Sequence, residues 1–98
     1  MTIDKILNAN ELTMELTGRL DTTTAPGLEA ELKTSLTGVD SLTMDFAKLE
    51  YISSAGLRVL LFAQKVMNKQ GKMVIRHVNE TIREVFEVTG FIDILIIE

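Results

Sequence analysis

The sequence contains no cysteine, no tryptophan, one proline and one histidine among its 98 residues. Without cysteine, the chain can form neither a disulfide framework nor a thiol-based active site. With one histidine and no cysteine, no cluster of metal-ligating residues stands out, so we expect no metal site and no cofactor. The lack of disulfides suits the cytoplasm, where we expect the protein to act.

Positive charge is also scarce. Ten lysines and arginines stand against fourteen aspartates and glutamates, a net charge of -4, and no basic cluster occurs. Nucleic-acid binding needs a cationic footprint, so we expect no nucleic-acid partner. The longest mostly apolar stretch, residues 57–66, contains Arg58 and Gln64 and is too short to span a membrane. Residues 1–5 lack the apolar core of a signal peptide.

The material that is present suits one domain. Hydrophobic residues make up 46% of the chain and charged residues 24%, so we expect residues 1–98 to form a single domain with one core. A chain of this length buries roughly two-thirds of its unfolded surface, which leaves little room for an embedded active-site cavity. We therefore expect a function on the surface, and the composition is compatible with the monomer that we expect.

Alternating residue types predict that the chain begins with a β-hairpin. Residues 3–7 lead into a turn at 8–10, and Leu12, Met14 and Leu16 then alternate with polar residues up to a strand end at 18–21. Three threonines at 22–24 predict the start of a helix with Pro26 in its early turn. The apolar stripe of this helix consists of Ala25, Leu28, Leu32 and Leu36, and Gly38 lies just beyond its end.

The second half continues the alternation of strands and helices. We expect a strand at 41–46, a connection at 47–52 and a largely buried helix from about Ser53 to Gln70, which stops at Gly71. Its leucines at 57, 60 and 61 are interpreted as core rather than as a ligand groove. A strand at 73–78 precedes a third helix, capped by Asn79 or Thr81 and ended by Gly90. Residues 92–97 are expected to close the fold as an apolar strand, or as a short turn plus a strand.

This order of elements predicts an α/β fold: a mixed, mostly parallel sheet with an N-terminal β-hairpin and helices packed on it. In such sheets the functional surface tends to lie beyond the carboxyl ends of the strands. Three loops are expected to meet there, at 18–24, 47–54 and 78–81.

The helix start at Ser53-Ser54-Ala55-Gly56 is the most distinctive segment. The ordinary role of a serine at this position is to cap the helix through its side-chain oxygen. A helix N-terminus also receives anions well, because its N–H groups are unpaired and the helix dipole is positive there. Gly56 is interpreted as clearing space for a partner or an anion. A phosphate on Ser54 would therefore fit without unfolding the domain.

Two carboxylates are candidates for positioning the serine segment. Asp21 follows a strand end, and Asp45 precedes Phe46 near the end of the next strand. Either side chain could hydrogen-bond or orient the serine loop. The alternatives are an ordinary strand end followed by a capping run at 21–24, and an ordinary strand-end carboxylate at 45.

Several segments together resemble the STAS domain, and in particular the stand-alone bacterial anti-sigma factor antagonists. They are Gly18-Arg-Leu-Asp21, Leu42-Thr-Met-Asp45-Phe46, Tyr51-Ile-Ser-Ser-Ala-Gly-Leu-Arg-Val-Leu60 and Val85-Phe-Glu-Val-Thr-Gly-Phe91. The resemblance covers essentially the whole chain, and the expected order of elements matches the STAS fold.

What the resemblance implies is partner switching. An unphosphorylated antagonist binds an anti-sigma factor that is also a serine kinase of the histidine-kinase-like ATPase type, and thereby releases a sigma factor. That kinase phosphorylates a serine or threonine two residues before the glycine, here Ser54 with the neighbouring Ser53 as the alternative, and a PPM-type phosphatase reverses the modification. The expected partner surface comprises Asp21, Thr22, Thr23, Ser53, Ser54, Ala55, Gly56 and Arg58. The family often has an acid before the acceptor and a hydroxyl after it, where this chain has Ser53 and Ala55.

Two other functions match parts of this pattern. A serine hydrolase also places its nucleophile between a strand and a helix, but position 52 is Ile where the hydrolase motif has glycine, and His77 lies in a strand pattern. We therefore expect no enzyme. The second alternative is a STAS scaffold, or a subunit of a larger signalling or lipid-transport complex, which would bind protein without phosphorylation.

Overall fold

The computed structural model describes all residues from Met1 to Glu98 and confirms the predicted α/β class. The sheet has the strand order β1-β2-β3-β4, with β1 antiparallel to β2 and the other neighbours parallel. The elements are β1 (Thr2–Asn8), β2 (Glu11–Leu20), α1 (Ala25–Ser35), β3 (Ser41–Ile52), α2 (Ser54–Gln70), β4 (Lys72–Arg76), α3 (Glu80–Thr89) and a short 3-10 helix, η1 (Phe91–Asp93).

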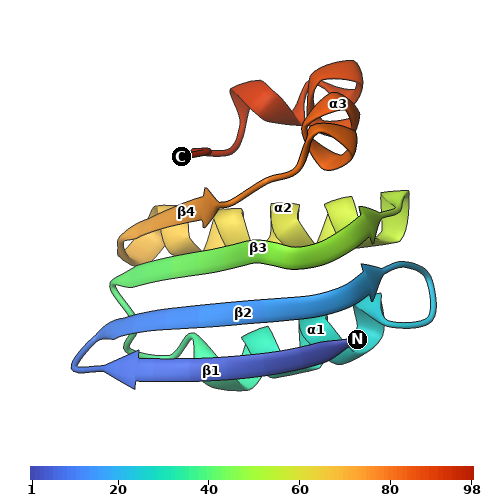
Figure 1. The fold of residues 1–98 in the computed structure, drawn as a ribbon. Coiled ribbons are helices and arrows are strands. Elements are labelled where there is room, and N and C mark those ends of the chain that lie inside the picture. Colours follow the sequence, from blue (N-terminus) through green and yellow to red (C-terminus); the bar gives the residue numbers. More distant parts are fainter.

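Both crossover helices, α1 and α2, cover the same face of the sheet (Figure 1). This follows from the topology, since the strands are added in one direction and each parallel crossover is right-handed. Helix α3 and the C-terminal segment lie beyond the β4 edge, and α3 also contacts β3. The opposite face of the sheet is left open. No helix is both long and apolar enough to cross a membrane.

The hydrophobic core lies between the sheet and the two crossover helices. The residues that alternate along β2 are fully buried, as is the predicted stripe of α1, so both patterns are confirmed. Burying one such leucine or methionine contributes about 1.5–3 kcal/mol relative to leaving it exposed. The central buried side chains are Leu12, Met14, Leu16 and Leu20 of β2, Leu28 and Leu32 of α1, Met44 and Phe46 of β3, and Leu57, Leu60 and Met67 of α2.

Strand β3 is twice as long as predicted: residues 47–52 continue the strand and are not a connection. Two bulges interrupt the regular alternation in this half of the strand. Glu15 pairs with Asp45 but Thr17 with Lys48, and Gly18 pairs with Leu49 but Arg19 with Tyr51. Each shift places one extra residue on β3.

The C-terminal prediction was partly wrong. Residues 91–93 form η1, and the only sheet pairing beyond it is a single bridge between Ile75 and Ile97. His77 also lies outside the strand that was predicted for it. Strand β4 ends at Arg76, and His77 adopts a left-handed backbone conformation with φ 59°.

Candidate functional site

The start of α2 lies beside the carboxyl ends of β2 and β3. Leu20 and Ile52, the last residues of the two strands, are paired neighbours, and the Ser53 N–H donates to the Leu20 carbonyl at 2.9 Å. The segments predicted as loops at 18–24 and 47–54 therefore meet, although residues 18–20 and 47–52 belong to strands. The third loop does not join them. Strand β4 ends opposite Asp45, and Asn79 in the following turn donates to the Leu49 carbonyl at 3.0 Å, below the end of β3.

Ser53 is the N-cap residue of α2, but its side chain does not cap the helix. Its backbone is extended, and its carbonyl accepts from the Leu57 N–H at 3.0 Å. The Ser53 hydroxyl is buried and has no hydrogen-bond partner. Ser53 thus enters α2 through its backbone alone, and its hydroxyl is shielded from solvent.

Ser54 is the first residue of α2, and its side chain is exposed. None of the side-chain hydrogen bonds in the structure involves it, so the ordinary role of a serine at a helix start is not fulfilled by Ser54 either. The first turn of this 17-residue helix contains no acidic residue. The free N–H groups and positive dipole end of α2 therefore face a position that is free of negative charge and suits an anion.

Gly56 has a different role from the predicted one. It is buried, and a Cβ at this position would lie 2.7 Å from Leu20 Cγ and 2.8 Å from Ile52 Cγ1. The absence of a side chain thus lets α2 pack closely on β2 and β3. The space is filled by core side chains and is not open to an anion.

Asp21 shapes the loop between β2 and α1. Its carboxylate accepts from the Thr23 hydroxyl at 2.7 Å and from the Thr23 N–H at 3.0 Å, and it also lies within hydrogen-bond distance of Thr24. The Thr23 hydroxyl, followed by these other donors, lowers the pKa of Asp21 below its ordinary value of 3.8 despite some desolvation. Asp21 makes no hydrogen bond to either serine, so its carboxylate orders its own loop.

A cation stacks beside this loop. The Arg19 guanidinium lies 4.3 Å from the centre of the Tyr51 ring and 3.8 Å from the Asp21 carboxylate. Arg19 and Tyr51 are exposed and Asp21 is half-buried. The two contacts therefore hold the Arg19 guanidinium on the surface, where β2 and β3 end, and are not part of the core.

The N-terminal turns of α1 and α2 enclose a shallow open groove with a volume of about 300 Å³. Its floor is apolar, and Glu29 and Arg58 supply the charged groups. Arg58 is exposed and has no ion-pair or hydrogen-bond partner. The lining residues are Thr22, Ala25, Pro26, Glu29, Ala55, Arg58 and Val59. The structure thus brings Thr22, Ala55 and Arg58 of the predicted surface together.

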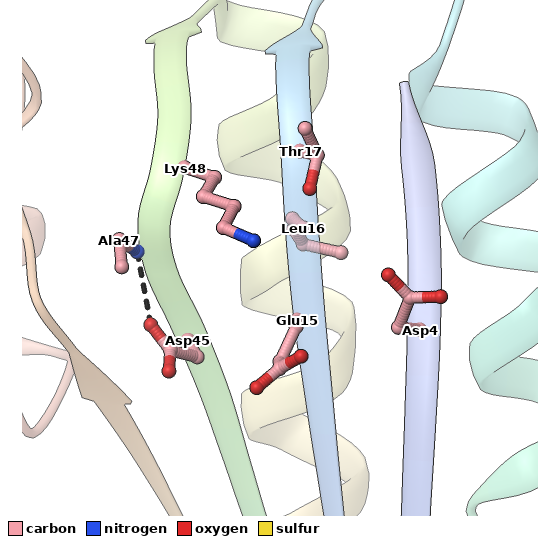
Figure 2. A pocket seen from close by; sticks show the side chains of 7 residues that line it. All are labelled: Asp4, Glu15, Leu16, Thr17, Asp45, Ala47 and Lys48. Atoms are coloured by element: carbon pink, nitrogen blue, oxygen red, sulfur yellow. Dashed lines mark hydrogen bonds between the residues drawn. The ribbon is translucent and has the colours of Figure 1, made fainter.

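Asp45 does not reach the serine segment, contrary to the prediction. It lies in the middle of β3, seven residues before Ile52 and therefore about 20 Å along the strand. Figure 2 shows its side chain on the open face of the sheet, near Glu15, Lys48 and, farther off, Asp4. The hollow among these residues is only about 60 Å³.

The Asp45 carboxylate instead supports a bulge and binds a histidine. It accepts from the Ala47 N–H at 2.9 Å, and His77 Nδ1 also lies 2.9 Å away. Burial raises the pKa of Asp45, but the Ala47 hydrogen bond and His77 outweigh it and hold the pKa below 3.8. The sequence offered no signal for this pair, because 32 residues separate its members. No group of three or more His, Cys, Asp or Glu side chains is placed to hold a metal ion.

The sequence and the fold are both similar to those of known proteins. The chain is 41% identical over 96 residues to BtrV, a protein of Bordetella bronchiseptica that is named as an anti-sigma factor antagonist. The aligned residues cover 96% of this chain and 81% of BtrV. A solved anti-sigma factor antagonist from Mycobacterium paratuberculosis has a TM-score of 0.88 at 20% identity, covering 98% of this chain and 83% of that one. The phosphorylated form of the Bacillus cell-fate determinant SpoIIAA has a TM-score of 0.76 at 18% identity, covering 99% and 91%.

The family comparison covers nearly the whole chain. Residues 4–97 match the model of a family described as "Mlab, STAS domain". This match includes all four segments that resembled the family in sequence, and two of them, 18–21 and 51–60, meet where β2 and β3 end. The chain belongs to the STAS domain family.

Proposed function

We propose that this protein is an anti-sigma factor antagonist that is regulated by phosphorylation of Ser54. The observation that carries the proposal is the exposed Ser54 hydroxyl, without a hydrogen-bond partner, at the first residue of α2 in a STAS domain. Relatives named as anti-sigma factor antagonists, at 41% identity in one case, support the assignment. In its unphosphorylated form the protein binds an anti-sigma factor and releases a sigma factor.

The choice of Ser54 over Ser53 rests on accessibility. A kinase must bring its catalytic groups to the acceptor oxygen, and the Ser53 hydroxyl is buried whereas Ser54 is exposed. The spacing of two residues to Gly56, which the family resemblance implies for the acceptor, selects the same serine.

The proposed partner surface surrounds that serine and consists of Asp21, Thr22, Thr23, Ser53, Ser54, Ala55, Gly56 and Arg58. Thr22, Thr23, Ser54 and Arg58 are exposed and supply side chains to it, whereas Ser53 and Gly56 support it from beneath. The groove between α1 and α2 adjoins this surface and contributes apolar area. A protein partner would thus meet a mixed surface with an apolar centre and a polar rim.

Phosphorylation would act at the interface rather than on the fold. It adds about -1.5 to -2 charges at a helix N-terminus, where negative charge is tolerated or mildly stabilising. At a docking surface the same dianion introduces repulsion and bulk, which can cost several kcal/mol. Since each 1.4 kcal/mol is about tenfold in affinity, a loss of two to three orders of magnitude is physically reasonable.

The partners that fit this proposal are a serine kinase of the histidine-kinase-like ATPase type, which is also the anti-sigma factor, and a PPM-type phosphatase. The protein itself would be a non-enzymatic regulator in the cytoplasm. His77 follows the end of β4 and contacts Asp45, which supports a role for it outside the serine segment.

The test is to isolate the protein from its native cells and locate phosphate by mass spectrometry, together with any ATPase-type kinase that copurifies. With that kinase, Ser54→Ala should abolish phosphate incorporation and bind constitutively, and Ser54→Glu should bind at least about 100-fold more weakly. Ser53→Ala is the matched control and should still be phosphorylated. Phosphate incorporation that survives Ser54→Ala would show that the acceptor is wrong.

A second candidate function is a scaffold or subunit that binds protein without phosphorylation. One observation favours it: Ser53 stands where the family often has an acid before the acceptor. In that case native Ser54 would carry no phosphate, and Ser54→Ala would leave binding of copurifying proteins unchanged.

A further inference from the structure

Arg58 lies one helical turn after Ser54 on the same face of α2. Residues four apart on a helix are surface neighbours, with Cβ atoms about 5–6 Å apart. Helical side chains also lean toward the N-terminus of their helix, so that the Arg58 side chain can reach the turn that contains Ser54. A helical ion pair is more stable when the negative residue comes first and the positive residue follows four positions later than in the reverse order. A phosphate on Ser54 and the guanidinium of Arg58 would have this order.

The Arg58 guanidinium is free to take a new partner. Of the four arginines, Arg19 has Asp21 and Arg76 has Glu98 as an acidic partner, whereas Arg58 and Arg83 have none. The acidic residue that lines the groove is Glu29, which forms an ion pair with Lys33 at 3.6 Å. Asp21 is occupied by its hydrogen bonds with threonines. An unmodified Ser54 offers Arg58 no charge to bind.

Resting on the phosphorylation of Ser54 proposed above, we infer that Arg58 binds the phosphate through a contact within α2. A guanidinium presents several donors in a planar fork that matches phosphate oxygens. In the unmodified protein, Arg58 contributes an unpaired positive charge to the groove between α1 and α2. This charge suits an acidic side chain of the partner. After phosphorylation the same cation is held over the first turn of α2. The modification therefore adds a dianion to the docking surface and withdraws a cation from it.

The contact can be tested without any partner protein, by placing phosphoserine at position 54 through genetic encoding. A nearby cation stabilises the dianion and lowers the second pKa of the phosphate, which is about 6 in phosphoserine. In a ³¹P NMR titration at low salt, Arg58→Gln should therefore raise that pKa by at least about 0.3 unit. Arg58→Lys should retain part of the effect, and 0.5 M salt should reduce the difference between wild type and Arg58→Gln.

Arg83→Gln is the matched control, because Arg83 is also exposed and without an acidic partner but lies on α3. It should leave the phosphate pKa unchanged. In ¹⁵N spectra, the Arg58 Nε–H signal should shift when position 54 is phosphoserine, and the Arg83 signal should not. Equal phosphate pKa values in wild type and Arg58→Gln, with no shift of the Arg58 signal, would overturn the inference. They would leave Ser54 phosphorylation intact, which the mass spectrometry of native protein decides separately.

Discussion

Gly56 of α2 packs directly against Leu20 of β2, so closely that a Cβ on Gly56 would lie 2.7 Å from Leu20 Cγ. Two residues that are distant in sequence are thus fitted to each other at the point where the serine segment is attached to the sheet. The contact sets how closely the first turn of α2 approaches the ends of β2 and β3.

The first prediction follows from this contact. Gly56→Ala should lower the free energy of unfolding by about 1–3 kcal/mol, because an added methyl group overpacks a full core. Adding Leu20→Ala to Gly56→Ala should cost less than the sum of the two single changes, since it removes the clashing atom. Urea unfolding measures all three variants.

Gly27 provides the control. It lies in α1, and a Cβ there would meet nothing within 4 Å. Gly27→Ala should therefore raise stability by about 0.4–1 kcal/mol, through higher helix propensity and a less flexible unfolded chain. If Gly56→Ala were equally harmless, the packing role of Gly56 would be refuted.

A second prediction concerns charge at the start of α2. Ser54→Asp should leave the free energy of unfolding unchanged or raise it by up to about 1 kcal/mol, because an anion is favoured at a helix N-terminus. Lys69→Asp, in the last turn of the same helix, should lower it. Thermal and urea unfolding at low salt would show both effects. A clear destabilisation by Ser54→Asp would mean that reduced partner binding reports on folding rather than on the interface.

Asn79 gives a third prediction, since it joins α3 to β3. Its Oδ1 accepts from the Ile82 N–H at 2.8 Å, and its Nδ2 donates to the Leu49 carbonyl at 3.0 Å. Asn79→Ala should cost about 1–2 kcal/mol of unfolding free energy. Asn79→Ser keeps a capping oxygen and loses the bond to Leu49, so it should cost less.

Thr81→Ala is the control for that prediction, because the cap of α3 is Asn79 and not the alternative Thr81. It should leave the unfolding midpoint nearly unchanged. Equal losses from Thr81→Ala and Asn79→Ala would argue against the observed cap.

The fourth prediction is a dependence of stability on pH. The pKa of Asp45 is lower in the folded protein than its ordinary value of 3.8, so the ionised carboxylate stabilises the fold. This contribution is present in full above the ordinary value and is lost as the pH falls through the lower, folded-state value. The stability difference between wild type and Asp45→Asn should therefore be constant at pH 5–6 and shrink toward pH 2.5. Urea unfolding across this range measures the difference, and a gap that stays constant down to pH 2.5 would contradict the role of the carboxylate.

The parts of the fold that the sequence predicted are those where residue types repeat with a regular period. The hairpin, the stripe of α1 and the end of α2 at Gly71 follow from such local patterns. Only the second half of β3, residues 47–52, escaped prediction. The buried residues Phe46, Leu49 and Ile52 are three apart, a spacing that the two bulges create and that is not typical of a strand.

The candidate site was predicted in part for a similar reason. Ser54 could be placed at the start of a helix from local signals, and it lies there. Asp45 could not be placed, since its distance from the serines depends on how far β3 extends past β4. Gly56 is ambiguous in sequence because a glycine can serve a ligand or a tight packing contact equally well, and only the positions of Leu20 and Ile52 distinguish the two.

The two bulges of β3 have a consequence for how an enzyme would reach Ser54. Deleting Ala47 would keep Phe46 and Leu49 on the core side, because the strand would then alternate regularly, so the extra residue is not needed for burial. What a bulge supplies is a bend and additional twist. If Ser54 is phosphorylated as proposed, the curvature of β3 just before α2 would set the direction from which the kinase approaches its hydroxyl. Straightening the strand would redirect that approach while leaving every side chain at the end of the sheet chemically unchanged.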